Sequence, residues 1–454
     1  MTAPDATSPA RPDTAPTSWR DSFAMYLQPR VLIVLFLGFS SGLPLALSGS
    51  TLRFWLRESH IDLETIGLFA LVGTPYTIKF LWAPLVDALS VPLLSKILGR
   101  RRGWLVVSQI MLVAAILLLG FCNPASTPWY VPFGAALLVA TASATQDIVV
   151  DAFRIESLPK DEQAAGMASY VAAYRISTLV STAGALFLID GFEKSGFARA
   201  DAWKLGYAAM AALIVIGIVT AIVAAEPDQS QIATAKNVGD PLKRVFETTK
   251  SALLDFLSLD MVAAVLLFVI LFKFTDAFSG IMTESFVVDI GFSKTDYAAI
   301  VKGVGLAATL VGGFAGGFVA RRYSLATSLW IGGVLQAVAN LSFSWLALVG
   351  TSQWALAFAI TCENFTSAIG TVIFVAYLSA LCQNPLHTAT QYALLTALAA
   401  VGRTYLSSVA GYVAKASGWP LFFVICVLVA IPSLVLLTYL QKRGHFEALG
   451  PVRV

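Results

Sequence analysis

The side chains best able to do chemistry are polar and ionisable groups that stand inside apolar segments. One stretch, Ala140–Pro159, ends a long apolar run and yet carries Gln146, Asp147, Asp151 and Arg154. A carboxylate inside a bilayer costs roughly 2.5–3.5 kcal/mol even on the most permissive insertion scale, and such groups mark functional positions. We therefore expect this stretch to contain a proton relay, a substrate contact or a gate.

The composition argues against a soluble protein. Of the 454 residues, 57% are hydrophobic and 13% are charged, whereas soluble domains carry about 25% charged residues. So much apolar surface does not fit inside one soluble core, and it predicts a polytopic helical protein embedded in a lipid bilayer. The net charge of +3 favours no particular partner, and we expect no nucleic acid.

The reactive residue types form no catalytic pattern. The four cysteines lie in or beside apolar segments without metal-ligand spacing, and the three histidines are scattered. We therefore expect no disulfide framework, no metal and no cofactor. Without an activated serine or cysteine constellation, an integral membrane enzyme is disfavoured, and we expect a protein that is not an enzyme.

Twelve segments are long and apolar enough to cross a bilayer, for which a helix needs about 20 residues. The predicted spans are Val31–Leu52, Thr65–Pro84, Trp104–Phe121, Val131–Val150, Ala164–Leu188, Trp203–Ala225, Met261–Met282, Tyr297–Val319, Leu325–Leu348, Trp354–Leu381, Thr388–Ala410 and Leu421–Leu440.

The longest connection, residues 226–260, separates six spans from six others. Its second part has the pattern of a surface amphipathic helix. We expect a disordered tail over residues 1–30, six-helix bundles over 31–225 and 261–440, and a second tail over 441–454.

Lysines and arginines predict the orientation, because cytoplasmic loops carry an excess of them. With both termini inside, 18 of the 30 bases fall on the cytoplasmic side, 7 fall outside and 5 lie within spans. We therefore expect both termini to be cytoplasmic.

The ionisable residues of the spans recur with a period of three helices. The third, sixth, ninth and twelfth spans contain no charge between their ends. Four lipid-facing helices around eight cavity-lining helices would give this pattern, and two six-helix repeats are a known transporter architecture. The charged residues at depth are the bases Lys79, Arg175, Lys273, Lys302 and Arg403 and the acids Asp147, Asp276 and Glu363.

Three of these groups lie near the midplane. At 1.5 Å per residue, Arg175, Lys273 and Glu363 stand about 16, 18 and 14 Å inside their spans. Transporters bind their substrate at this depth. Asp276 follows Lys273 by one turn on the same helix face. The alternative is structural: a local Lys273–Asp276 ion pair that helps one helix insert, or salt bridges between helices.

A second group lies at the cytoplasmic edge. Asp151 and Arg154 are expected there. They could latch the loop Arg100–Arg102 that precedes the third span, which we call the arginine loop, or they could be purely interfacial. The predicted gating residues are Asp87, Arg100, Arg101, Arg102, Asp151 and Arg154.

Eight stretches distributed over both halves together resemble the AmpG-type muropeptide permeases of the major facilitator superfamily. They are Gly38–Leu56, Ile61–Asp87, Gly99–Leu105, Ser143–Pro159, Tyr174–Ser181, Lys273–Gly280, Lys302–Gly313 and Glu363–Cys382. The Gly99–Gly103 loop also resembles the general facilitator signature between the second and third spans, although an insert separates it from Asp87.

The resemblance implies an all-α major facilitator fold of twelve transmembrane helices in two pseudo-symmetric six-helix bundles. It implies a monomeric importer in the inner membrane of a Gram-negative bacterium. The expected substrates are N-acetylglucosaminyl-1,6-anhydro-N-acetylmuramyl peptides released by cell wall turnover, taken up by proton symport. Peptidoglycan recycling of this kind also controls β-lactamase induction, and with it antibiotic resistance.

The residues at depth suit such a ligand, which carries two sugars, several carboxylates and an amine. Carboxylates are bound by arginine and lysine, and we expect Arg175, Lys273 and Arg403 to supply these contacts. Gln146 and Asn364 are the expected sugar or amide partners.

The proton carrier is expected among Asp276, Glu363 and Asp147. The remaining alternatives are a facilitator for another acidic solute, such as an acyl-CoA or a peptide, and a non-transporting receptor on the same fold.

Overall fold

The structure is a computed structural model that describes residues 26–159, 162–227, 261–381 and 388–449. The expected amphipathic helix of the 226–260 connection and residues 1–25 and 450–454 of the two expected tails lie outside these residues. Within them the chain forms helices and no strands. The predicted all-α membrane fold is confirmed.

Within the described residues, ten helices are long and apolar enough to cross a membrane. Two further crossings, residues 63–88 and 388–417, are built from short helical pieces. These two are the second and the eleventh of the twelve predicted spans.

The first bundle contains α2 (Pro29–Leu47), α3 (Ser50–Glu58), α4 (Leu63–Leu68), η1 (Phe69–Gly73), α5 (Thr74–Ile78), η2 (Lys79–Leu81), α6 (Ala83–Ala88), α7 (Leu94–Leu98), α8 (Arg100–Phe121), α9 (Tyr130–Ser157), α10 (Gln163–Leu179), η3 (Val180–Gly184), α11 (Ala185–Lys194) and α12 (Arg199–Val223).

The second bundle contains α15 (Val262–Gly280), α16 (Thr283–Ile290), α17 (Lys294–Asp296), η4 (Tyr297–Val304), α18 (Gly305–Arg322), α19 (Leu325–Val349), α20 (Gln353–Leu381), α21 (Thr388–Thr404), η5 (Leu406–Val409), α22 (Ala410–Ser417), α23 (Trp419–Val429), α24 (Ile431–Lys442) and α25 (His445–Ala448).

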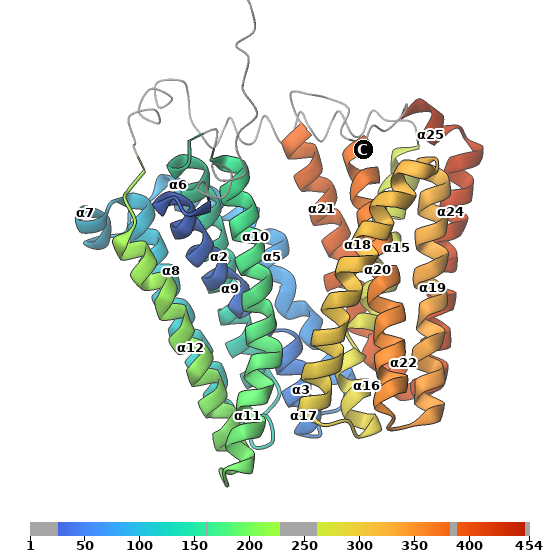
Figure 1. The fold of residues 1–454 in the computed structure, drawn as a ribbon, viewed down its shortest axis with the longest axis horizontal. Helices are drawn as coiled ribbons and strands as arrows, with labels where there is room; N and C mark the ends of the chain where they lie inside the picture. The colour runs from blue at the N-terminus through green and yellow to red at the C-terminus, as the bar shows by residue number, and fades with distance from the viewer. Residues whose placement is uncertain (1–25, 160–161, 228–260, 382–387, 450–454) are drawn as a thin grey trace, which may run out of the picture.

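The two bundles lie side by side and meet at only one end (Figure 1). They converge where α3, α11, α16, α17 and α22 lie, which we call the closed end. They stand apart where α6, α10, α21 and α25 lie, which we call the open end. The chain enters the first crossing and leaves the last one at the open end.

The four charge-free spans pack within their own bundles. In the first bundle α8 packs on α9 and α12, and α12 also packs on α2. In the second, α19 packs on α20 and α23, and α24 packs on α15. The contacts between bundles come from the other crossings, as the period of three predicts: α3 meets α16, α4 meets α22, and α11 meets α17.

A proline kink directs the first crossing toward the closed end. Pro44 lies inside α2 and removes a backbone donor, so the helix ends at Leu47. The Ser48 hydroxyl donates to the Pro44 carbonyl at 2.9 Å, and α3 begins again at Ser50. The restarted helix carries Arg53 beyond the predicted end of this span.

Close approach of backbones explains two glycine contacts. A Cβ at Gly42 would lie 2.4 Å from the Tyr174 carbonyl oxygen, so only glycine lets α2 approach α10 this closely. A Cβ at Gly411 of α22 would lie 1.8 Å from the Leu63 carbonyl oxygen in the other bundle. The contact between α4 and α22 therefore depends on the absence of a side chain.

Another contact between bundles joins two irregular helical segments. The π-helical segment η3 packs against the π-helical segment η4. Thr51 of α3 donates to the Ser181 carbonyl at 2.8 Å, which ties the first crossing to η3. These irregular segments lie where the bundles touch, directly beside the two cavities between the bundles.

Candidate substrate cavity

Two cavities lie between the bundles and share Gly280. The first, of about 300 Å³, has two cations and no acid in its wall, and we call it the arginine cavity. The second, of about 280 Å³, contains both signs of charge, and we call it the mixed-charge cavity. The polar residues of the arginine cavity are Ser48, Arg53, Tyr76, Arg403 and Thr404. Those of the mixed-charge cavity are Ser50, Arg175, Thr178, Thr182, Thr283, Glu284, Lys302, Thr309, Glu363 and Asn364.

An ion pair between the bundles joins the walls of the two cavities. Arg53 on α3 donates to both carboxylate oxygens of Glu284 on α16, at 3.3 and 3.4 Å. Tyr297 donates to the same carboxylate at 3.1 Å, and the Lys302 ammonium lies 3.9 Å away. The Glu284 side chain is only 5% exposed. Of these partners only Arg53 belongs to the other bundle, so its pairing with the buried Glu284 carboxylate joins the bundles at this level.

Two arginines line the cavities and form no ion pair within the part of the chain that the structure describes. Arg175 on α10 lines the mixed-charge cavity, and Arg403 on α21 lines the arginine cavity. Both side chains are exposed, and neither forms an ion pair with a described residue. They come from opposite bundles, and the positive charges of both guanidinium groups affect the Tyr174 side chain. Guanidinium groups in this state are available to a carboxylate ligand.

Glu363 and Asn364 form a polar ridge on α20 in the mixed-charge cavity. Asn364 donates to the Glu363 carboxylate at 2.8 Å and accepts from Thr309 at 3.2 Å. This arrangement presents carboxylate, amide and hydroxyl groups together, which suits the hydroxyl and amide groups of a polar ligand. The predicted residues Arg175, Arg403, Glu363 and Asn364 therefore share the space between the bundles.

Lys273 and Asp276 are paired with each other. The Lys273 ammonium donates to Asp276 at 3.1 Å and to the Thr371 hydroxyl at 2.8 Å. The local ion pair that the sequence left open is therefore present. Both side chains are partly exposed, yet neither belongs to the wall of the two cavities.

Gln146 and Asp147 lie within the first bundle. Gln146 is fully buried and donates to the Ser40 and Ser41 hydroxyls at 3.1 and 3.4 Å, so it joins α9 to α2. Asp147 lies near Lys79, and one of its oxygens is enclosed without a hydrogen-bond partner among the described residues. The structure does not bring Gln146 or Asp147 to the wall of either cavity.

The arginine loop is held by other acids than we expected. Arg101 donates to Glu156 at 2.9 Å, and the Glu226 carboxylate accepts from the Arg101 backbone at 2.8 Å. Asp151 instead pairs with Arg154 at 3.8 Å on the same helix. These contacts lie at the open end within the first bundle.

Two further predicted gating residues lie in the same region. Arg102 donates to the Ala221 carbonyl of α12 at 2.9 Å, and Arg100 begins α8. Asp87 belongs to α6, and the structure describes only its backbone.

Ion pairs at the closed end are the charged features that sequence reasoning missed. Lys294 binds Glu58 and Glu193 of the other bundle, and Arg57 binds Asp289. We placed these residues, like Arg53 and Glu284, outside the spans, because the apolar runs end before them. The sequence signal that could have found these residues is a helical pattern that continues past Met282. In the structure this helical span runs as far as Ile290.

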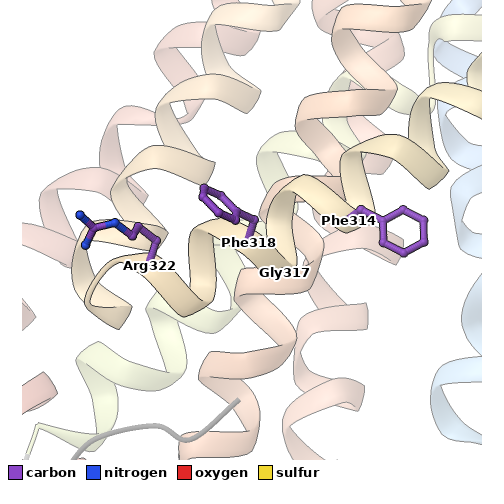
Figure 2. A pocket seen from close by; sticks show the side chains of 5 residues that line it. Phe314, Gly317, Phe318 and Arg322 are labelled. Atoms are coloured by element: carbon purple, nitrogen blue, oxygen red, sulfur yellow. The ribbon is translucent and has the colours of Figure 1, made fainter.

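A third recess, of about 560 Å³, lies along α18 beside Phe314, Phe318 and Arg322. Figure 2 shows these side chains following one another along the helix, at the four-residue spacing that defines one face. The two phenylalanines are 83% and 69% exposed. Apart from Arg322 this recess has no polar side chain, so it is not the candidate substrate site. No group of three or more metal-ligating side chains occurs in the described part of the chain.

Comparisons with known proteins agree with this architecture. The family model described as Major Facilitator Superfamily matches residues 34–404. The chain is 39% identical over 429 residues to the anhydromuropeptide permease of Escherichia coli K12, covering 94% of this chain and 82% of that one. It is 33% identical to putative transporter AmpG 4 of Rickettsia felis, covering 91% and 97% of the two chains.

Solved structures show the same fold. The structure of the nucleoside transporter NupG superposes with a TM-score of 0.66 at 13% identity, covering 93% of this chain and 100% of that one. Together with the family model and the permease similarity, this shows that the chain belongs to the Major Facilitator Superfamily and, within it, to the relatives of the anhydromuropeptide permeases.

Proposed function

We propose that this protein imports anhydromuropeptides, that is, N-acetylglucosaminyl-1,6-anhydro-N-acetylmuramyl peptides, for peptidoglycan recycling. The observation that carries the proposal is the similarity to the E. coli anhydromuropeptide permease, which extends over 94% of the chain and both bundles. The transporter acts from the bacterial inner membrane as a monomer. Where the cell couples recycling to β-lactamase induction, its cargo contributes to antibiotic resistance.

The chemistry of the cavities supports this substrate. Arg175 and Arg403 line the cavities as cations that form no ion pair with a described residue, which suits the carboxylates of a stem peptide. Glu363 and Asn364 suit sugar hydroxyls, acetamido groups or an amine. Lys273 is already bound to Asp276, so we rank it below the two arginines as a carboxylate ligand.

We assign the open end to the cytoplasm. The open end carries the basic cluster that includes Arg101, Arg102, Arg154 and Lys442, and cytoplasmic loops carry an excess of bases. Both ends of the described chain lie at the open end, so both termini are cytoplasmic. The structure then represents the state in which the cavities face the cytoplasm, from which an importer releases its substrate.

Import is proton-driven in this proposal. Asp276 and Glu363 lie on helices of the second bundle and next to bases, and Asp147 has an oxygen without a partner among the described residues. Asp276 is the favoured carrier, because protonation would free Lys273 for a substrate carboxylate. Loss of one charge within a low-dielectric site changes every nearby interaction.

The test is uptake of labelled anhydromuropeptide into right-side-out membrane vesicles. Replacing Arg175 by Gln removes a charge-assisted contact worth about 1.5–3 kcal/mol, so kcat/KM should fall at least tenfold. The matched control is Arg199→Gln, which removes the same charge from a half-exposed position at the closed end. Equal activity of the Arg175 variant and the wild type would contradict the assignment.

A further inference from the structure

Arg53 lines the arginine cavity, but its charge is already bound by the protein. Its guanidinium donates two hydrogen bonds to the Glu284 carboxylate, at 3.3 and 3.4 Å. The guanidinium side chain is 16% exposed, so it still borders the open space. In this state the Glu284 carboxylate neutralises Arg53, which is a cation in the wall of the arginine cavity.

The partners of Glu284 are divided unequally between the bundles. Tyr297 and Lys302, which contact the carboxylate at 3.1 and 3.9 Å, belong to η4 in the same bundle as Glu284. Arg53 belongs to α3 in the other bundle. When the closed end opens, Tyr297 and Lys302 move with Glu284, whereas Arg53 moves away from it.

The same movement does not free Arg403 or Arg175 from an internal carboxylate. Arg403 and Arg175 have no ion pair with a described residue in the present state, so opening removes none. Arg53 is therefore the cavity cation whose availability depends on whether the closed end is shut. A guanidinium fork binds one carboxylate in the paired geometry at a time, so Glu284 and a substrate carboxylate compete for it.

We propose that Arg53 is a state-dependent ligand for a carboxylate of the substrate and that Glu284 is its internal competitor. With the closed end open, Arg53 binds the substrate carboxylate in the arginine cavity. As the closed end shuts, Glu284 takes Arg53 back and the substrate loses one contact. The affinity then falls in the state that faces the open end, which favours release there. This inference rests on the proposed function, because it takes the substrate to be an anhydromuropeptide.

The experiment measures equilibrium binding of an anhydromuropeptide with free carboxylates to the purified protein. Glu284→Gln keeps the shape of the side chain and removes the competing charge. Binding should tighten about tenfold, because one charge-assisted contact to Arg53 becomes available in every state. Efflux of bound substrate should slow by a similar factor. An analogue with amidated carboxylates should bind the variant and the wild type equally.

Two matched variants separate competition from mere opening of the closed end. Asp289→Asn removes an ion pair with Arg57 at the same end, and neither residue lines a cavity. It should open the closed end, and any tightening of binding that follows should depend on Arg53, so it should be lost in Asp289→Asn/Arg53→Gln. The double variant Arg53→Gln/Glu284→Gln should lose the gain, because the proposed ligand is absent.

The outcomes distinguish the inference from the proposed function. If the wild type binds and Glu284→Gln binds no tighter, the inference is wrong and the function stands. If a gain in Asp289→Asn persists when Arg53 is also replaced by Gln, opening alone explains the effect and the inference is also wrong. If the wild type does not bind anhydromuropeptide at all, the proposed function fails and the inference fails with it.

Discussion

The charged side chains near the cavities differ in whether the protein already neutralises them. Arg53 is held by Glu284, and Lys273 is held by Asp276. Arg175 forms no ion pair with a described residue. A neutralised base contributes to binding only after its internal partner leaves, whereas a free base contributes at once. This difference orders the residues by when they act in a transport cycle.

His445 provides a residue-scale test that is independent of transport. Its side chain lies outside the membrane-spanning segments, packs next to Tyr377 with a 3.1 Å contact between Nε2 and the tyrosine hydroxyl, and is 8% exposed. Burial lowers the pKa of His445 below its ordinary value of 6.5. The folded protein therefore keeps this ring neutral at a pH where the unfolded chain binds a proton.

The sign of the pH dependence follows from this difference. Stability is retained above the unfolded pKa of 6.5 and is lost as the pH falls below it, because only the unfolded state gains the proton. The midpoint of thermal unfolding in detergent should therefore fall more steeply for the wild type than for His445→Phe between pH 7.5 and roughly pH 5.5. Identical slopes would show that His445 is not kept neutral.

The sequence predicted some residues of the site and missed others for a physical reason. Arg175, Arg403 and Glu363 interrupt apolar runs, so their cost in a membrane makes them visible without a structure. Arg53 and Glu284 lie beyond the ends of such runs, where a charge in a loop looks the same as a charge in a buried contact. Only the pairing of α3 with α16 distinguishes the two cases.

At the scale of elements, the glycine contact between α4 and α22 controls how closely the bundles approach. The Cβ of an alanine at position 411 would lie 1.8 Å from the Leu63 carbonyl oxygen. The backbone of α4 or of α22 would have to move to relieve this clash. Gly411→Ala should therefore destabilise the closed end and slow transport severalfold. Gly191→Ala is the control, since no atom lies within 4 Å of its Cβ position.

The measurement is the labelling rate of a buried reporter at the closed end. Ser285 on α16 is fully buried, so Ser285→Cys in a protein without its native cysteines should react slowly with a membrane-impermeant maleimide. Adding Gly411→Ala should raise the rate severalfold, and adding Gly191→Ala should leave it unchanged. A rate unaffected by Gly411→Ala would mean that this contact does not limit closure.

The elements were predictable where hydropathy alone decides them. Among the described residues, ten of the twelve spans are long apolar helices, some of them kinked as at Pro44, because a run of about 20 apolar residues satisfies its backbone in that form. The second span breaks into short pieces near Gly73 and Pro75, and the eleventh is interrupted by η5. The hydrophobic period does not indicate these breaks, and the pieces of the second span pack both on α9 and on α21 of the opposite bundle. The first and seventh spans extend further than predicted because their charged ends pair across the closed end.

At the scale of the molecule, ion pairs concentrate on one side of the contact between bundles. Lys294 with Glu58 and Glu193, Arg57 with Asp289, and Lys415 with Glu64 all join the bundles at the closed end. The division into two six-helix bundles and the period of three were visible in the sequence. The state of the transporter was not, because the same sequence must form both the closed and the open contacts.

The central claim is that the two bundles import anhydromuropeptide at the expense of a proton gradient. It is tested most directly by accumulation of labelled anhydromuropeptide in liposomes that contain only this protein, with and without an imposed gradient. We expect uptake above the external concentration only with the gradient, and its loss in Asp276→Asn while exchange of labelled for unlabelled substrate continues. No uptake and no exchange in the wild type under either condition would contradict the account.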